Sequence, residues 1–469
     1  MTLTSPGFAL FLALALIVFQ LAPGNRRAAV LLGFSLAFYW FWNPVHLALL
    51  LGVTAAVFAL VRAGARRGPE PARFRLAMSL VAGLLTVLVV FKCGAPLLDH
   101  LQGGAHAAAF LAPLGLSYYL FKMISYILEV YWETLEPISE FIPFCLYVAF
   151  FPQMVSGPIQ RPEPFFSQLP NLGHPDPALV TDGLRRILLG LFKKLVIADR
   201  LAATVAQVNA QPGAFSALDL LLAAYLFALQ LYADFSGLTD IALGIGQLFG
   251  LTGPENFNEP FRATDLPDFW RRWHMSLTSW LTDYLFTPLR MSLRNLGTAG
   301  LALAVFINMF AVGVWHGPTL TYAAFGALNG LLMIGSILTM KRRLAFLKRH
   351  PVLGAVRAWT APFITFHLMV IGWILFRADS FRSAMAYFAG LVSPAHPLSL
   401  HLDRGVLGWA GASVLILWGV HRASQAGSRL HRFFLGSRSA RWTLYYATIL
   451  IIVRWGEIFG VQRFIYAKF

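Results

Sequence analysis

Residues 301–318, LALAVFINMFAVGVWHGP, indicate the fold and contain the first candidate functional residue. From Leu301 to Val314 the stretch carries no formal charge, and similar apolar runs recur along the 469-residue chain. His316 stands at the end of this run, directly before Gly317-Pro318, which we expect to break or end a helix. A polar imidazole in or beside a membrane is costly unless it is paired or has a function. His316 is therefore the leading candidate for chemistry.

The composition predicts an all-α polytopic membrane protein. Hydrophobic residues make up 58% of the chain and charged residues 12%, against about 25% charged in soluble domains. The apolar runs are long and show no strand-type alternation, so they predict helices rather than a barrel. The candidate spans are residues 7–23, 28–42, 44–61, 76–91, 107–128, 140–155, 183–198, 217–233, 235–251, 299–316, 320–340, 358–376, 405–420 and 442–458.

The net charge of +16 gathers in short loops between apolar runs, which is the positive-inside pattern. We predict that three such clusters are cytoplasmic, and we expect no nucleic-acid partner. Attraction to anionic lipid headgroups is a second interpretation that is compatible with the first. The clusters contain Arg62, Arg66, Arg67, Arg73 and Arg75, then Lys341, Arg342, Arg343, Lys348, Arg349 and Arg357, then Arg422, Arg429, Arg432, Arg438 and Arg441.

Several familiar patterns are missing from the sequence. Cys93 and Cys145 both lie in or beside apolar runs, so no disulfide framework is expected. No serine-hydrolase elbow, zinc-protease motif, P-loop or cysteine-rich pattern is present, and we expect no metal and no bound cofactor. No basic residue precedes Arg26, so we expect residues 8–21 to be a retained span rather than a cleavable signal.

A second histidine, His274, lies in the aromatic segment 254–290, which is polar enough to leave the bilayer. Large side chains recur there at three- and four-residue steps, which predicts one face of an interfacial helix with Pro267 in its first turn. His274 becomes a functional candidate if this helix folds back towards His316; otherwise it is one more polar residue on an exposed face. The recurring residues are Trp270, Trp273, Leu277, Trp280, Leu281 and Tyr284.

Polar or proline-rich stretches interrupt the pattern at two other places. Asp234 and Asp240 fall in the long apolar stretch 218–251, where carboxylates are costly and often functional. We favour a structural role for both, with Asp234 accepting bonds from the backbone or from arginines and holding a break at Ser236-Gly237. Residues 150–170 contain five prolines, which predicts a shaped loop or a broken helix.

The setting of His316 allows two interpretations. A histidine in an apolar run is most often a packed residue that is hydrogen-bonded to a neighbouring helix. Gly313 and Gly317, however, have the spacing that lets helices approach closely. A histidine at a helix break is also freer to face a cavity, and neutral imidazole suits general-base work near pH 7.

Five blocks, taken in this order, resemble the membrane-bound O-acyltransferase family, in the branch that contains the bacterial alginate O-acetyltransferase membrane subunit. Residues 371–378 and 464–466 extend the resemblance nearly to the C-terminus. Within the blocks, Pro152, Gln153, Gly157, Pro158, Asp234, Ser236, Gly237, Asn256, Asn258, Trp270 and Trp273 are the expected structural motif residues. The blocks are FPQMVSGPIQR at 151–161, DFSG at 234–237, PENFN at 254–258, FWRRWH at 269–274 and WHG at 315–317.

The resemblance implies that His316 is the catalytic histidine and that His274 is a second functional residue in the same cavity. It implies a helical core around a transmembrane funnel or tunnel, with re-entrant and interfacial helices. The expected parts are N-terminal transmembrane helices (1–105), a catalytic core (106–340) and C-terminal transmembrane helices (341–469) within one membrane domain. In bacterial members an acetyl or similar group is exported, often to a periplasmic acyltransferase partner that modifies a polysaccharide.

These inferences give a mechanistic hypothesis. His316 acts as general base on an acceptor hydroxyl that attacks an acyl thioester, with acetyl-CoA or another acyl thioester as donor. His274 orients the donor or stabilises the oxyanion. Arginine suits bidentate binding of phosphate, although anchoring to lipid headgroups explains the arginines equally well. The donor- and substrate-binding candidates are Arg161, Arg271, Arg272, Trp315 and Asn308.

Two alternatives stay open at the level of sequence. The same family could transfer acetyl to peptidoglycan or D-alanine to teichoic acid, rather than acetylate an alginate-like exopolysaccharide. A protein of another class, a proton-coupled transporter, could also carry buried Asp234, Asp240, His274 and His316, although no internal repeat is evident. In each case we expect a multi-pass protein of the bacterial inner membrane.

Overall fold

The computed structural model describes residues 2–64, 69–102, 113–155, 157–173, 176–393, 399–424 and 437–458, and over these ranges the chain forms helices and no strands. This confirms the predicted all-α fold. Some predictions of the sequence concern residues outside the described ranges: Ser156, Arg66, Arg67, Arg429, Arg432 and residues 464–466.

Seven helices of the described chain are long and apolar enough to cross a membrane. The protein is therefore a multi-pass membrane protein. Many apolar side chains on its surface are exposed, including Trp359 and Leu21, as expected for helices that face lipid. The candidate spans are Pro44–Gly64 (α3), Glu70–Gly94 (within α4, Glu70–Gln102), Ala217–Leu248 (α11), Arg294–His316 (mostly α15, Gly297–His316), Leu320–Arg349 (α16), Pro351–Arg377 (α17) and Arg404–Ala423 (within α19, Arg404–Ser424).

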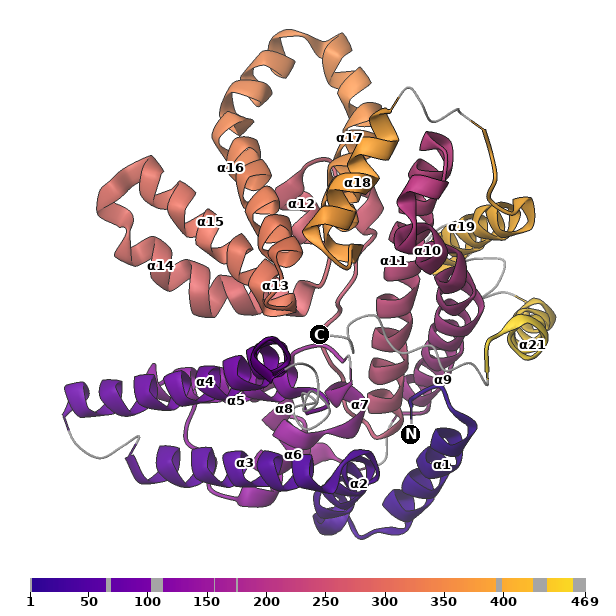
Figure 1. Cartoon of the computed structure of the whole chain (residues 1–469). Coiled ribbons are helices and arrows are strands. Elements are labelled where there is room, and N and C mark those ends of the chain that lie inside the picture. Colours follow the sequence, from indigo (N-terminus) through magenta and orange to yellow (C-terminus); the bar gives the residue numbers. More distant parts are fainter. Residues whose placement is uncertain are drawn as a thin grey trace.

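Shorter helices complete the fold (Figure 1). Helices α1, α2 and α6 come from the N-terminal half of the chain, and α2 packs against both of the others. Helices α18 and α21 come from the C-terminal half. Within the described ranges, two segments are π-helices. This form is rare in proteins, and where it occurs it is often at a functional site. The bounds are α1 Pro6–Leu21, α2 Arg27–Trp42, α5 Leu116–Tyr131, α6 Phe141–Ala149, α7 Phe151–Met154, α8 Pro162–Phe166, α9 Pro177–Leu191, π-helix Phe192–Ala198, α10 Asp199–Ala210, α12 Leu266–Trp270, α13 Met275–Leu281, π-helix Thr282–Phe286, α14 Thr287–Ser292, α18 Phe381–Val392 and α21 Arg438–Trp455.

The central helix of the fold is α11. In its most apolar window 72% of the residues are buried inside the protein, against 17% for the window in α4, so α11 faces protein and α4 faces mostly outward. The sequence predicts two spans here, 217–233 and 235–251, with a break at Ser236-Gly237. This prediction is wrong, because α11 runs unbroken from Ala217 to Leu248.

Glycines explain why Ser236-Gly237 does not break the helix. A Cβ on Gly237 would lie 2.8 Å from the carbonyl oxygen of Gly190, and a Cβ on Gly190 would lie 2.5 Å from the carbonyl oxygen of Gly237. Gly183 and Gly244 form a second pair of the same kind. These small residues let α9 approach α11 closely, which is how helices pack where lipid supplies no hydrophobic drive.

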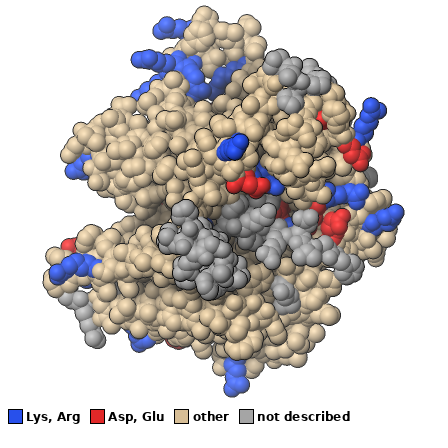
Figure 2. Space-filling model, viewed as in Figure 1, with Lys and Arg blue, Asp and Glu red and all other residues tan. Residues whose placement is uncertain are grey.

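Figure 1 shows α3, α4 and α5 in one group and α15, α16 and α17 in another, with α9 and α11 beside them. The turn between α16 and α17 lies at the upper edge, and Figure 2 shows lysine and arginine gathered there. The last turns of α16 supply the basic residues of the second predicted cytoplasmic cluster: Lys341, Arg342, Arg343, Lys348 and Arg349.

The proline-rich segment is broken, as the sequence predicts. The short helices α7 and α8 lie on either side of an irregular stretch at 157–161, and a 3₁₀ turn follows at Leu169–Asn171. Pro152, Gly157 and Pro158 are buried in protein. Gln153 accepts a hydrogen bond from the ammonium of Lys122, at 2.7 Å, so buried polar groups replace the missing helix bonds.

The prediction of one interfacial helix across 267–284 is wrong. Pro267 does lie in a first helical turn, but α12 ends at Trp270 and a new helix begins only at Met275. Trp270, Trp273 and Trp280 are at most 6% exposed, so they pack against protein instead of anchoring at a lipid interface. Trp273 stacks on Phe269 with ring centres 5.6 Å apart, which helps the chain to turn back at this point.

Candidate active site

His316 is the last residue of α15 and is 4% exposed. The helix ends there, as the sequence predicts, and the amide of Gly317 donates to the carbonyl of Val314 at 3.1 Å. A Cβ on Gly313 would lie 2.8 Å from Cα of Gly326, so α15 and α16 meet with almost no space between their backbones. The predicted role of this glycine in close packing is confirmed, and it fixes His316 against α16.

Aromatic rings from three helices surround the His316 imidazole. The ring centres of Trp315 on α15 and Phe376 on α17 lie 4.6 and 4.8 Å from it. Tyr322 and Phe325 on α16 lie at 6.0 and 6.3 Å. The imidazole therefore lies in an apolar pocket of fixed shape.

His274 lies in the turn between α12 and α13 and is 1% exposed. Its φ is 47°, which places a residue other than glycine in the left-handed region. Such a conformation costs of order 1–3 kcal/mol and persists only where the surroundings enforce it. Burial lowers the pKa of His274 to about 3, because the charged ring would lose its hydration. The imidazole is thus neutral near pH 7.

The loop at 256–258 enforces the backbone conformation of His274. The amide of Asn258 donates to the carbonyl of Arg272 at 3.0 Å, and the amide of Met275 donates to the carbonyl of Asn256 at 3.0 Å. The side chain of Asn256, which is fully buried, holds Ser276 by two further bonds. Asn256 and Asn258 therefore clamp the chain on both sides of His274.

The two histidines meet on one indole. The ring centre of Trp315 lies 6.1 Å from that of His274 and 4.6 Å from that of His316. Phe235 of α11 also packs on His274, edge to face, with ring centres 4.6 Å apart. The condition that the sequence sets for His274, that its segment folds back towards His316, is met. Although the two histidines are 42 positions apart in the sequence, the packing of α11, α12 and α15 brings them into one site.

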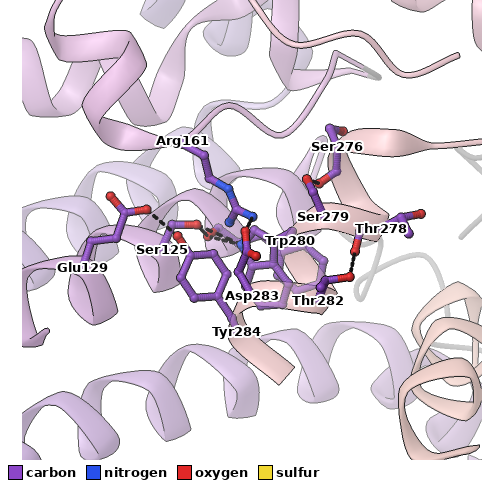
Figure 3. A network of polar contacts seen from close by, with 11 residues as sticks. Ser125, Glu129, Arg161, Ser276, Thr278, Ser279, Trp280, Thr282, Asp283 and Tyr284 are labelled. Carbon is purple, nitrogen blue, oxygen red and sulfur yellow. Dashed lines mark hydrogen bonds and ion pairs between the residues drawn. The ribbon is translucent and has the colours of Figure 1, made fainter. Parts of the chain in front are cut away.

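An aromatic stack leads away from this site. Trp315 lies 6.0 Å from Phe121 of α5, and Phe121 stacks on Trp280 of α13 at 4.2 Å. The ring centre of Trp280 in turn lies 5.1 Å from that of Tyr284. The indole of Trp280 donates to Ser125 at 2.8 Å, which fixes α13 against α5 (Figure 3).

Arg161 lies at the far end of this stack rather than beside the histidines. Its guanidinium forms an ion pair with Asp283 and lies 4.4 Å from the ring centre of Tyr284, whose hydroxyl donates to Glu129 (Figure 3). Burial raises the pKa of Glu129, against the lowering effects of Tyr284 and Arg161. Arg161 thus has a carboxylate partner in this structure.

The other predicted binding residues are dispersed. Arg272 pairs with Asp268 at 2.9 Å, and Arg271 approaches the same carboxylate at 3.7 Å while 67% of its side chain is exposed. Asn308 is two turns before His316 on α15, about 12 Å away along the axis. Trp315 is the predicted binding residue that contacts both histidines.

The two intramembrane aspartates have basic partners. For Asp234, where the sequence predicts bonds from the backbone or from arginines, the structure shows a lysine, and the helix break that Asp234 was expected to hold is absent. Asp234 pairs with Lys194 at 2.8 Å, and Asp240 pairs with Lys193 at 2.7 Å and Arg186 at 3.1 Å. Both lysines lie in the π-helix Phe192–Ala198, and each pairs with an aspartate of α11. The sequence analysis did not connect these lysines to the aspartates.

A cavity of about 220 Å³ lies beside the ion pairs of Asp240, with Lys193 and Arg186 in its wall. Its wall includes Ser236, which is next to the Phe235 that packs on His274, and also Asn258. The hydroxyl of Ser236 is buried and has no hydrogen-bond partner among the described residues. Phe257, also in the wall of the cavity, packs on Phe235 with ring centres 5.0 Å apart, so aromatic side chains connect this cavity to His274.

Lys92 is a residue of the site that the sequence analysis missed. It lies on α4, and its ammonium donates to the carbonyl of Trp315 and lies 5.0 Å from the centre of the indole ring. The positive charge of Lys92 interacts electrostatically with the imidazole of His316. The predicted span 76–91 ends one residue before Lys92, so the lysine resembles a flanking charge in the sequence. Its position inside an otherwise apolar helix is the signal that could have found it.

Comparison with known proteins identifies the family of the chain. The family model of the membrane-bound O-acyltransferase family matches residues 133–375, more than half of the chain. The chain is 32% identical to the "Probable alginate O-acetylase AlgI" of Pseudomonas putida, over 87% of this chain and 83% of that protein. It is 30% identical to the peptidoglycan O-acetyltransferase of Helicobacter pylori, over 79% of this chain and 74% of the relative.

A further relative, matched over less of the chain, is the teichoic acid D-alanyltransferase of Streptococcus thermophilus, with 30% identity over 56% of this chain and 68% of that protein. The names of the three relatives describe the transfer of an acyl group to alginate, to peptidoglycan and to teichoic acid. The family match spans both histidines and the loop that clamps His274. The chain therefore belongs to the membrane-bound O-acyltransferase family and is a multi-pass membrane O-acyltransferase.

Proposed function

We propose that this protein moves an acetyl group from a cytoplasmic acyl thioester, acetyl-CoA or a related donor, across the bacterial inner membrane for O-acetylation of an alginate-like exopolysaccharide. The observation that carries the proposal is the meeting of His274 and His316 on Trp315, inside a helical core that matches alginate O-acetylases over most of its length. A periplasmic acyltransferase partner then passes the group to the polysaccharide.

His316 serves as the general base. Its imidazole takes the proton of an acceptor hydroxyl while the hydroxyl oxygen attacks the thioester carbonyl, and the same proton then goes to the departing thiolate. A positioned base contributes about 10²–10⁴-fold to such a rate. The aromatic side chains of Trp315, Tyr322 and Phe376 surround the imidazole and exclude water from it, which favours transfer over hydrolysis.

His274 has a supporting role. Its left-handed backbone conformation, held by Asn256 and Asn258, fixes the neutral imidazole beside Trp315. A neutral imidazole has one donor and one acceptor nitrogen, so it can orient either the donor thioester or the acceptor hydroxyl. Holding His274 in this position costs free energy, because its left-handed backbone conformation is strained.

The experiment uses cells in which this chain is the membrane subunit for polymer acetylation. Acetate released from the exopolysaccharide by mild base is measured for wild type, His316→Ala and the matched control His350→Ala, a histidine that is exposed at a helix end. We expect His316→Ala to lose ester-bound acetate while the protein stays in the membrane, and His350→Ala to keep it. Wild-type acetate in His316→Ala would contradict the assignment.

The same family includes relatives named for peptidoglycan and teichoic acid, so the acyl group and the polymer are tested separately. Mass spectrometry of the envelope polymers distinguishes acetyl esters on uronate residues, acetyl esters on muramic acid and D-alanyl esters. We expect acetyl esters on the exopolysaccharide. A proton-coupled transporter would instead move a solute in reconstituted vesicles without forming any ester.

A further inference from the structure

Lys92 brings a positive charge to the candidate active site. It lies within the apolar candidate span of α4, yet its ammonium turns inward onto the last turn of α15. Among the residues that the structure describes, no carboxylate forms an ion pair with Lys92. An ammonium without a counter-ion is costly in a membrane, so a charged residue in this position calls for a function.

Two buried groups at this point have N–H donors that are not all used in the described part of the chain. The indole nitrogen of Trp315 is buried and has no hydrogen-bond partner there. The ammonium of Lys92 has three N–H donors, and one of them is directed to the carbonyl of Trp315. Buried donors are nearly always satisfied in native proteins, so the unsatisfied indole N–H of Trp315, beside the remaining N–H groups of Lys92, indicates a missing acceptor.

We propose that Lys92 Nζ and Trp315 Nε1 form the oxyanion site, which binds the carbonyl oxygen of the donor thioester. The inference rests on the proposed function, because it concerns the same acyl transfer. Lys92 Nζ lies 5.0 Å from the centre of the indole that carries Trp315 Nε1. The same indole contacts His274 and His316, so the proposed carbonyl site borders both histidines. The lysine thereby acquires a negative partner when charge develops in the reaction.

The acceptor hydroxyl oxygen forms a bond to the thioester carbonyl carbon and gives its proton to His316. The π electrons of the carbonyl move to its oxygen, which becomes an oxyanion held by Lys92 and Trp315. When the oxyanion collapses, the carbon–sulfur bond breaks and the thiolate takes the proton from His316. One ester and one thiol result.

Fixed donors of this kind act on the transition state more than on the bound substrate. Loss of one such donor typically costs about 10²–10³-fold in rate. Removal of either donor should therefore reduce the transfer rate without weakening donor binding. A residue that merely supports the end of α15 would change the amount of folded protein or the affinity instead.

The test uses the full-length protein with Lys92→Met, Lys92→Arg and Trp315→Phe, and with Lys341→Met as a matched control at an exposed lysine. Lys92→Met removes the charge at nearly constant length, and Trp315→Phe removes the N–H but keeps a ring. The readouts are ester-bound acetate per membrane-embedded protein in cells, and binding of radiolabelled acetyl-CoA to isolated membranes.

For Lys92→Met we expect a loss of about 100-fold in transfer, with binding of acetyl-CoA within about twofold of wild type. Trp315→Phe should show a loss in the same direction. Lys92→Arg, which keeps a charged donor, should recover part of the activity, and Lys341→Met should match wild type. Partial rescue by arginine is not expected if Lys92 only fills space.

The proposal is overturned if Lys92→Met and Trp315→Phe keep wild-type acetylation, or if their loss equals the loss of acetyl-CoA binding or of folded protein. Failure of the proposed function has a different signature: His316→Ala then keeps the ester, or wild-type membranes do not bind acetyl-CoA. In the second case the cell-based comparison of the Lys92 and Trp315 variants still decides whether the oxyanion site exists.

Discussion

Asn256 and Ser276 are joined by two hydrogen bonds: the side-chain Oδ1 of Asn256 accepts from the Ser276 amide at 3.2 Å and from its hydroxyl at 2.6 Å. Ser276 is two residues after His274, whose backbone is left-handed. The pair therefore fixes the start of α13 and, through it, the direction of the His274 side chain. This clamp links the loop after α11 to the candidate active site.

Replacement of Asn256 by alanine should impair both stability and transfer. The two donors of Ser276 would be buried without an acceptor, at a cost of about 1–3 kcal/mol. A small displacement of His274 reduces the rate further, since a 1 Å misplacement can cost about 10²-fold. We expect ester-bound acetate to fall at least about tenfold per folded protein. The measurements are acetate release and thermal unfolding in detergent.

Asn258→Ala is the matched control for this variant. Asn258 is exposed and contributes its backbone amide and carbonyl to the clamp, and alanine keeps both groups. We expect near wild-type behaviour. Equal defects in the two variants would mean that the side-chain bonds of Asn256 do not hold His274.

A second prediction compares two consecutive lysines. Lys194 pairs with Asp199 at 2.6 Å and Asp234 at 2.8 Å, and all three side chains are at most 7% exposed. Lys194→Met leaves two buried carboxylates without this partner, which should cost about 3–5 kcal/mol. Lys193→Met should cost less, because Asp240 keeps its pair with Arg186. The unfolding temperature of purified protein should fall much further for Lys194→Met, and the reverse order would refute this account of α11.

Local patterns were sufficient to predict several features. The end of α15 at His316-Gly317 follows from a glycine and a proline after an apolar run, and the close approach at Gly313 follows from glycine spacing. These features depend on residues that are neighbours in sequence. The pairing of His274 with His316 was predicted only as a condition, because their meeting depends on a chain reversal that the aromatic spacing does not encode.

Tertiary contacts decided what the sequence analysis got wrong. Ser236-Gly237 looks like a helix break, but Gly237 faces Gly190 and serves the approach of α9 to α11. Trp270 and Trp273 have helical spacing, yet the chain turns at His274 because Asn256 and Asn258 bind the flanking backbone. Lys92 is one residue beyond a predicted span, and only the fold shows that it turns inward to Trp315.

The last prediction concerns the helix contact that fixes His316. A Cβ on Gly313 would collide with the carbonyl of Tyr322 and lie 2.8 Å from Cα of Gly326, so Gly313→Ala must separate α15 from α16. Such overpacking costs about 1–3 kcal/mol. Gly313 is about 4.5 Å from His316 along the helix axis, so the separation also displaces the imidazole from Trp315 and Phe376. We expect ester-bound acetate to fall at least about tenfold per folded protein. Gly335→Ala, at a helical glycine with open space around its Cβ position, should leave acetylation unchanged, and a normal rate for Gly313→Ala would show that the imidazole tolerates this shift.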